Sequence, residues 1–193
     1  MHNNLPKIFI YLDHYNSDDF SYNNINLGVI YRNYNSVDRA IELVKISEAC
    51  KRKKYQLYVS NDIKLALKHK ANGIYIPSFN KSKKFENFEN KKLTILGSAH
   101  SQKEIYEKNL QGCKIIFLSP VFPIKKKNTY LGLHKFNFLT YSNNVNIYAL
   151  GGISKKNINK LKNFNIKGFG GISFFKKKPA LFTGPVYQRI KFF

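Results

Sequence analysis

The sequence has little of what secreted, disulfide-built or membrane-spanning proteins use. It contains two cysteines, Cys50 and Cys113, too few and too far apart for a disulfide framework or a zinc site, so we expect buried free thiols. No apolar stretch reaches the roughly eighteen residues of a membrane span. Residues 1–6 lack the basic and apolar regions of a signal peptide. We therefore expect a cytoplasmic protein with no membrane partner.

Acidic residues are also scarce: 11 Asp and Glu stand against 33 Lys and Arg, which gives a formal net charge of +22. Such an excess can indicate a nucleic-acid partner. However, the lysine groups at 51–54, 81–84, 125–127 and 176–178 are spread along the chain. The abundance of Lys, Asn, Ile, Phe and Tyr is also what AT-rich codons produce. Genome composition explains the charge as well as function does, and we do not expect nucleic-acid binding.

The chain does contain eight short apolar runs whose residues are continuous rather than alternating, as in parallel strands covered on both faces. They are residues 7–12, 28–31, 56–60, 73–76, 94–97, 115–118, 146–150 and 169–173. Helix-like spacing lies between several of them, at residues 37–51, 62–70, 102–111 and 155–163.

This alternation predicts the α/β class, and eight units predict a compact (β/α)8 TIM barrel with short loops. An open doubly wound sheet is the alternative fold. The length of 193 residues and an apolar content of 43% suit one domain that spans residues 1–193.

A glycine turn is the most informative motif. Gly151-Gly152-Ile153 follows the apolar run 146–150, and Ser154 could cap a helix after it. Glycines let backbone N–H groups approach an anion, so the turn is typical of a phosphate site, although most such pairs are only turns. A second glycine turn at residues 169–173 could share the same ligand.

Polar groups follow most of the other strands, where the chemistry of such a barrel collects. They include Arg32, Asp62, Ser98, His100 and the lysines at 125–127. A common mouth with these groups suits a small phosphorylated ligand. His100 could transfer protons or could bond neighbouring backbone to shape its loop, and Asp62 could also cap the helix that starts there.

Several segments, in order and at matching spacing over about residues 7–175, resemble the thiamine phosphate synthases and the related thiazole tautomerases. The segments are Gly97-Ser-Ala-His-Ser101, Ser119-Pro-Val-Phe-Pro123, Ala149-Leu-Gly-Gly-Ile153 with Asn157, and residues 168–173. The resemblance implies the barrel fold and an enzyme that joins hydroxymethylpyrimidine diphosphate to thiazole phosphate, with Mg²⁺ assisting, to give thiamine phosphate and diphosphate.

The resemblance also implies roles for particular residues. His100 and Arg32 would be catalytic, and Asp62 would be a Mg²⁺ ligand. The resemblance also implies residues that contact the thiazole phosphate and residues that contact the diphosphate. The thiazole phosphate would be held by Gly152, Ile172 and Ser173, and the diphosphate by Ser98, Lys127 and Arg32.

Departures from the family pattern concentrate in the pyrimidine half. Ile30 and Tyr34 replace a glutamine and a lysine that flank the arginine, residues 77–80 lack the second magnesium aspartate, and Ile124 and Lys126 replace hydroxyls. A thiazole tautomerase, which needs only thiazole phosphate and a proton-transfer group such as His100, is therefore the alternative, together with a non-catalytic thiazole-phosphate-binding relative. The sequence leaves a homo-oligomeric state and the role of residues 181–193 open.

Overall fold

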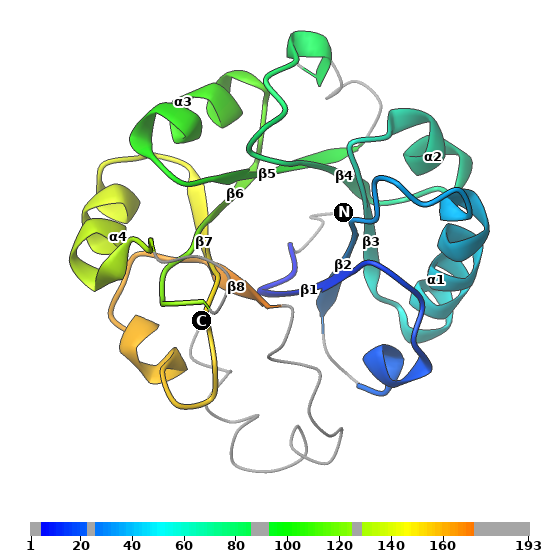
Figure 1. The fold of residues 1–193 in the computed structure, drawn as a ribbon, viewed down its shortest axis with the longest axis horizontal. Coiled ribbons are helices and arrows are strands. Elements are labelled where there is room, and N and C mark those ends of the chain that lie inside the picture. The colour runs from blue at the N-terminus through cyan, green and yellow to red at the C-terminus, as the bar shows by residue number, and fades with distance from the viewer. Residues whose placement is uncertain (1–4, 23–25, 86–92, 125–128, 172–193) are drawn as a thin grey trace.

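Eight parallel strands close into a barrel in the computed structural model, which describes residues 5–22, 26–85, 93–124 and 129–171 (Figure 1). Each strand pairs with the next, and β8 returns to β1 with Phe169 opposite Ile8. The strands are β1 (Ile8–Leu12), β2 (Leu27–Tyr31), β3 (Gln56–Ser60), β4 (Gly73–Ile76), β5 (Thr94–Ala99), β6 (Ile115–Leu118), β7 (Asn146–Leu150) and β8 (Gly168–Gly171). The predicted TIM barrel is confirmed, and the open doubly wound sheet is excluded.

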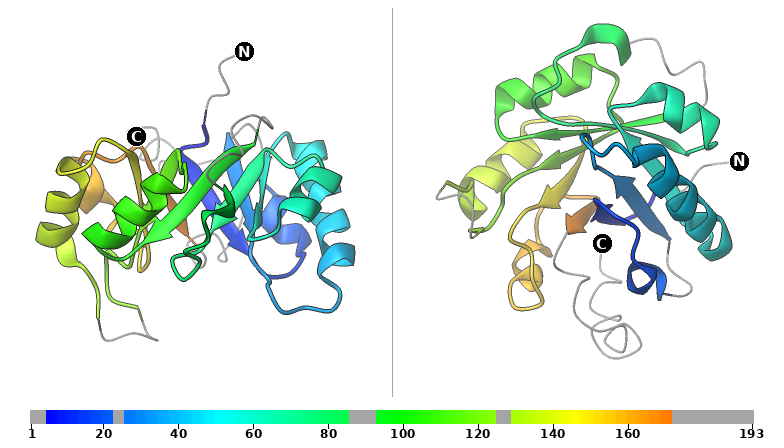
Figure 2. Two further views of the ribbon diagram at one scale, coloured as in Figure 1. Left: turned by 90° about the horizontal axis from the view of Figure 1, so that it is seen from above. Right: turned by 45° about the vertical axis from the view of Figure 1, so that its right-hand side comes forward.

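Helices cover the outside of the barrel, as the views in Figures 1 and 2 show. They are α1 (Arg39–Lys53), α2 (Ile63–Lys68), α3 (Gln102–Leu110) and α4 (Gly132–Tyr141). Leu43, Ile46 and Cys50 are buried along α1 at the three- and four-residue spacing of one helix face. This apolar stripe packs against the strands, while the lysines of the opposite face remain in water.

The prediction of a helix over residues 155–163 is wrong, since the structure has turns and the short 3-10 segment η4 (Ile158–Leu161) there. The Asn157 side chain accepts from the Ser154 N–H and donates to the Gly152 carbonyl, at 2.8 Å each. Such side-chain bonds to backbone compete with helical hydrogen bonds. Helix α4 was not predicted, because its glycine and aromatic residues are weak helix formers and it depends on burial of Phe136 and Leu139. The segments η1 (Ser17–Phe20) and η2 (Lys83–Phe85) were not predicted either.

The barrel interior is filled mainly by aromatic side chains. Phe9 lies at its centre, with its ring centroid 5.0 Å from that of Phe117 and 5.6 Å from that of Tyr148. The edge-to-face geometry of both pairs is favourable for aromatic quadrupoles. A Cβ atom on Gly28 would lie 2.3 Å from the Phe9 ring, so this large side chain requires a glycine on the neighbouring strand. The interior is therefore a packed core.

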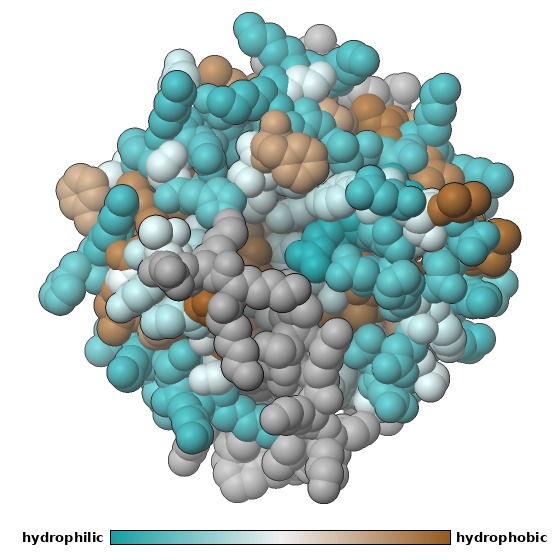
Figure 3. Space-filling view, in the orientation of Figure 1, coloured by the Kyte–Doolittle hydropathy of each residue, from teal (hydrophilic) through white to brown (hydrophobic). Residues whose placement is uncertain are grey.

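Figure 3 shows mostly hydrophilic side chains on one face of the molecule, with hydrophobic ones scattered between them. In the part of the chain that the structure describes, no helix combines the length and the apolarity that crossing a bilayer would require.

Candidate active site at the carboxyl ends of the strands

The described candidate residues lie at or after the carboxyl ends of their strands. Ser98 is the second-last residue of β5, and His100 comes directly after that strand. Arg32 follows β2, Asp62 follows β3, and Gly152 follows β7. In a parallel barrel these ends face one side, so the topology brings the five residues to a common mouth. Three other candidates, Lys127, Ile172 and Ser173, lie outside the described residues.

The glycine turn after β7 is tightly packed against the loop after β6. Gly151 and Gly152 have φ values of +89° and +70°, in the left-handed region that favours glycine. A Cβ atom on Gly152 would lie 2.5 Å from the Phe122 carbonyl oxygen. The Gly151 carbonyl accepts from the Phe122 N–H at 3.2 Å, and the Gly152 carbonyl accepts from Asn157. Both positions therefore require glycine, and both carbonyls are bound within the protein.

The side chain that stabilises this turn differs from the one that the sequence predicted. The N-terminal end of η4 carries no side-chain cap, and Ser154 contributes its backbone N–H and carbonyl rather than its hydroxyl. The amide of Asn157 fixes the residues on both sides of Ile153 instead. An asparagine five residues after a glycine is a weak sequence signal. The hydrogen bonds of Asn157 to this turn were therefore not predicted.

Arg32 is held by a carboxylate that sequence reasoning missed. Its Nε and Nη2 atoms donate to the two carboxylate oxygens of Asp13, at 3.0 and 2.9 Å. The hydrogen bonds that Arg32 donates to Asp13 raise the pKa of Arg32. The guanidinium carbon also lies 5.8 Å from the centroid of the Tyr11 ring. Asp13 follows β1, and the parallel pairing of β1 with β2 places it beside the end of β2.

Tyrosines and serines occupy the β2–β5 part of the mouth. Ile30, which replaces the glutamine of the family pattern, is fully buried in the interior cluster. The Ser60 hydroxyl donates to the Tyr34 hydroxyl at 3.0 Å. Burial raises the pKa of Tyr75 to about 12, and its interaction with the Ser98 hydroxyl acts against this rise. These hydroxyl groups are therefore neutral at physiological pH and can serve as hydrogen-bonding partners.

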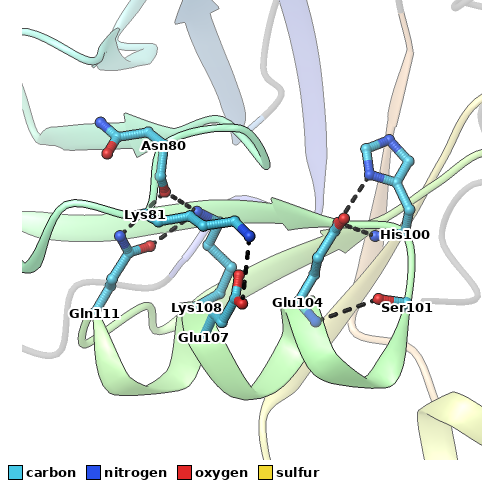
Figure 4. A network of polar contacts seen from close by, with 8 residues as sticks. All are labelled: Asn80, Lys81, His100, Ser101, Glu104, Glu107, Lys108 and Gln111. Atoms are coloured by element: carbon cyan, nitrogen blue, oxygen red, sulfur yellow. Dashed lines mark hydrogen bonds and ion pairs between the residues drawn. The ribbon is translucent and has the colours of Figure 1, made fainter.

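His100 forms a close pair with Glu104, one turn into α3 (Figure 4). Its Nδ1 atom lies 2.9 Å from Oε2 of Glu104, and the same oxygen accepts from the His100 backbone N–H at 2.7 Å. A carboxylate only accepts, so Nδ1 carries the hydrogen and Nε2 of neutral His100 carries the lone pair. The Ser101 hydroxyl caps α3 by accepting from the Glu104 N–H at 3.3 Å. Helix geometry therefore fixes the orientation of the imidazole.

Asp62 has two partners within the protein. Its Oδ1 accepts from the Leu65 N–H at 2.9 Å and caps α2, and its Oδ2 lies 3.7 Å from Nη1 of Arg39. The helix-capping role considered from sequence is thus present. Next to it, Asn80 donates from its side chain to Oδ1 of Asn61.

The side chains at this corner are poorly suited to serve as ligands of a magnesium ion. Mg²⁺ prefers carboxylate and water oxygens in octahedral geometry. Here one carboxylate already caps a helix beside a guanidinium, and the neighbouring amides bind each other. Among the described residues, no group of three or more His, Cys, Asp or Glu is arranged to hold a metal ion. The resemblance to magnesium-using enzymes and the local chemistry therefore disagree at this corner.

The closed eight-stranded barrel, with polar side chains and a glycine turn at its mouth, places the protein in the class of α/β-barrel proteins whose sites form at strand ends. More particularly, the chain belongs to the thiamine monophosphate synthase family, whose model matches residues 27–175.

Individual relatives agree with this assignment. The chain is 29% identical to a thiamine-phosphate synthase of Pediococcus pentosaceus over 83% of its own length and 77% of the relative's. It is 32% identical to one of Prochlorococcus marinus subsp. pastoris over 70% of its own length, and it spans only 40% of that relative. A thiamine phosphate pyrophosphorylase structure from Pyrococcus furiosus superposes with a TM-score of 0.70 at 18% identity, over 86% of this chain and 85% of the other, which supports the fold.

Proposed function

We propose that the chain is a thiamine-phosphate synthase of thiamine biosynthesis. In this reaction the bond from the pyrimidine methylene carbon to the diphosphate oxygen breaks, and its electron pair leaves with the diphosphate. The thiazole nitrogen then gives its lone pair to that carbon and forms the new carbon–nitrogen bond. The products are thiamine phosphate and diphosphate, and no oxidant or reductant is needed.

The observation that carries the proposal is the glycine turn after β7, in a chain that belongs to this family over residues 27–175. With both of its carbonyls bound internally, this turn can offer backbone N–H groups to a phosphate. Gly152, together with Ile172 and Ser173, would bind the thiazole phosphate. Each hydrogen bond to the charged phosphate would contribute about 1.5 to 3 kcal/mol.

The diphosphate would lie toward the opposite part of the mouth. Arg32, Ser98 and Lys127 are the proposed contacts there. Arg32 is preoriented by Asp13, and a planar guanidinium suits bidentate binding of phosphate oxygens. In the proposed reaction, Arg32 stabilises the negative charge that develops on the leaving diphosphate. The phosphorylated substrates are thus the proposed partners. That residues 1–193 form a single domain stays a prediction.

Thiazole tautomerase is the second candidate function, and the His100–Glu104 pair is the observation that favours it. Isomerisation of the thiazole phosphate needs a base that removes a proton from one position, and the protonated base then returns a proton at another position. The Nε2 lone pair of His100 is suited to that step, because Glu104 fixes the tautomer from the other side. The tautomerase would use the same phosphate-binding turn.

The two functions are separated by diphosphate release from the purified protein given pyrimidine diphosphate, thiazole phosphate and Mg²⁺, with each component omitted in turn. A synthase releases diphosphate only when both organic substrates are present. A protein that binds thiazole phosphate but releases no diphosphate contradicts the synthase proposal. Isomerisation that needs no metal and is lost in His100→Ala would then establish the tautomerase.

A further inference from the structure

Lys108 is a fully buried cation that the proposed reaction does not use. It lies on α3, and its Nζ atom donates to the Asn80 carbonyl at 2.6 Å and to Oε1 of Gln111 at 2.8 Å. Burial lowers the pKa of Lys108. Its hydrogen bonds go to neutral oxygens, so the ammonium is anchored by dipoles. A buried charge is costly, and its retention calls for a structural or functional reason.

Gln111 completes an attachment between α3 and the loop after β4 (Figure 4). Its Nε2 atom donates to the Asn80 carbonyl at 3.1 Å and to the Ser82 carbonyl at 2.8 Å. An ion pair also joins the loop to the surface of α3, where Nζ of Lys81 lies 3.7 Å from Oε1 of Glu107. The Asn80 carbonyl therefore accepts hydrogen bonds from two side chains, one on α3 and one on the residue that caps its C-terminal end.

On its other side, Asn80 joins the loop after β4 to the loop after β3. Its Nδ2 donates to Oδ1 of Asn61, and its own Oδ1 accepts from the Ser82 N–H at 2.8 Å. Asn61 has a φ of +57° and its N–H donates to the Tyr75 carbonyl at 2.9 Å. The two loops are thus connected directly by an amide pair, at the place where the family resemblance implies a magnesium ion.

We propose that this corner is a cation-independent lock, in which Lys108 and Gln111 are positioning residues that hold Asn80 against Asn61, so that the phosphorylated ligand binds without a divalent cation at the β3–β4 corner. The inference rests on the proposed function for the identity of the ligand. A bridging cation would normally join two such loops through their carboxylates. In this chain, a direct hydrogen bond between Asn80 and Asn61 makes the connection.

Electron paramagnetic resonance of Mn²⁺ with the purified full chain tests the lock without any measurement of activity. We expect Asn61→Asp/Asn80→Asp to create a Mn²⁺ site that the unmodified chain lacks. The control Asn109→Asp/Asn159→Asp adds the same charge at exposed positions and should create none. Binding by the unmodified chain that Asp62→Asn abolishes would overturn the proposal. No binding, or binding that Asp62→Asn leaves unchanged, supports it.

Binding of inorganic diphosphate, measured by calorimetry with and without a chelator, tests the consequence for the ligand. We expect the dissociation constant to change by less than about twofold, because the cation contributes nothing at this corner. A tenfold or larger loss of affinity in the chelator would overturn the proposal. Failure to bind diphosphate under either condition would instead contradict the proposed synthase, while the Mn²⁺ experiment would still decide the nature of the corner.

Hydrogen exchange tests the positioning role of Lys108. Lys108→Met removes the donor but keeps most of the length of the side chain, and should accelerate exchange of the Ser82 amide at least tenfold. Lys103→Met, an exposed change on the same helix, is the control, and Lys108→Arg should restore part of the protection. Unchanged exchange of Ser82 in a folded Lys108→Met protein would overturn the role.

Discussion

The β6–β7 side and the β2–β4 side of the barrel mouth are built by different means. Next to β7, backbone forms the surface, since Gly151 and Gly152 have positive φ values and pack against the loop after β6. Next to β2, β3 and β4, side chains fill the mouth and bind one another, as in the Arg32–Asp13 ion pair and the Asn61–Asn80 amide pair. A backbone surface tolerates few residue types, whereas a network of side chains can change its members together.

The largest expected effect is at the backbone side. Gly152→Val should weaken thiazole phosphate binding by about tenfold to a hundredfold for each hydrogen bond that is lost, since each hydrogen bond to a charged group contributes about 1.5 to 3 kcal/mol. The new Cβ would lie 2.5 Å from the Phe122 carbonyl oxygen. Calorimetric titration with thiazole phosphate measures the loss, and circular dichroism checks the fold.

Gly132→Val is the matched control for this change. Gly132 also has a positive φ, +71°, but its Cβ would have no neighbour closer than 3.9 Å. It should therefore show similar backbone strain and keep its affinity for the ligand. Equal loss of affinity in both variants, or none in Gly152→Val, would contradict the phosphate site.

On the β2–β4 side, Ile30→Gln asks whether the mouth can accept the family's glutamine. Ile30 is fully buried among aromatic and aliphatic side chains. An unsatisfied amide there should lower the free energy of unfolding by about 2 kcal/mol. Urea denaturation measures this loss, and the exposed change Val37→Gln is the control. A loss below about 0.5 kcal/mol would mean that the amide finds hydrogen-bonding partners, and that this side can be restored to the family pattern.

Glu104→Gln tests the histidine that lies between the two sides. The amide oxygen can still accept from His100, but the negative charge that stabilises a protonated imidazole is removed. If His100 is the proton-transfer group, turnover should fall about tenfold while KM changes little. Steady-state kinetics of thiazole phosphate isomerisation measures both parameters. Glu107→Gln, one turn further along α3, should leave turnover unchanged. An equal fall in both variants would point to a general effect on the helix.

The smallest expected effect concerns the two buried cysteines. Cys50 lies in the layer outside β3, and Cys113 lies in the layer outside β6. Burial raises the pKa of both Cys50 and Cys113 to about 12, from an ordinary value of 9.0. Each folded thiol keeps its proton more tightly than the unfolded chain does. The resulting contribution to stability is complete below the unfolded pKa and is lost as pH rises toward 12.

Labelling with a disulfide reagent at pH values from 7 to about 9, where free thiols become reactive, measures this protection. We expect both thiols to react only after unfolding and at the same rate. Faster reaction of Cys113 in the folded protein would show that the layer beside β6 opens independently of the layer beside β3.

Much of the fold was predictable because its signals are local. Continuous apolar runs identified all eight strands, within one or two residues wherever their ends are described, since each strand is covered on both faces. Asp62 and Ser101 precede helices and cap them as their residue types favour. By contrast, the predicted helix after Ser154 does not form, because the Asn157 side chain binds the backbone there.

The residues that the sequence missed act through contacts between distant segments. Asp13 meets Arg32 only when β1 lies beside β2, and Lys108 meets Asn80 only when α3 packs behind the loop after β4. Nothing adjacent in sequence marks these side chains as partners. The roles of His100, Arg32, Ser98 and Gly152 stay predictions that the experiments above can test.

The sequence by itself determined the barrel and the glycine turn, because hydrophobic periodicity and backbone freedom are properties of short segments. Only the tertiary structure decided which charges and amides satisfy one another at the mouth. That choice depends on distances between residues such as Asn61 and Asn80, which become neighbours only after the strands align. The same alignment gives the mouth one side built from backbone and one side built from interacting side chains.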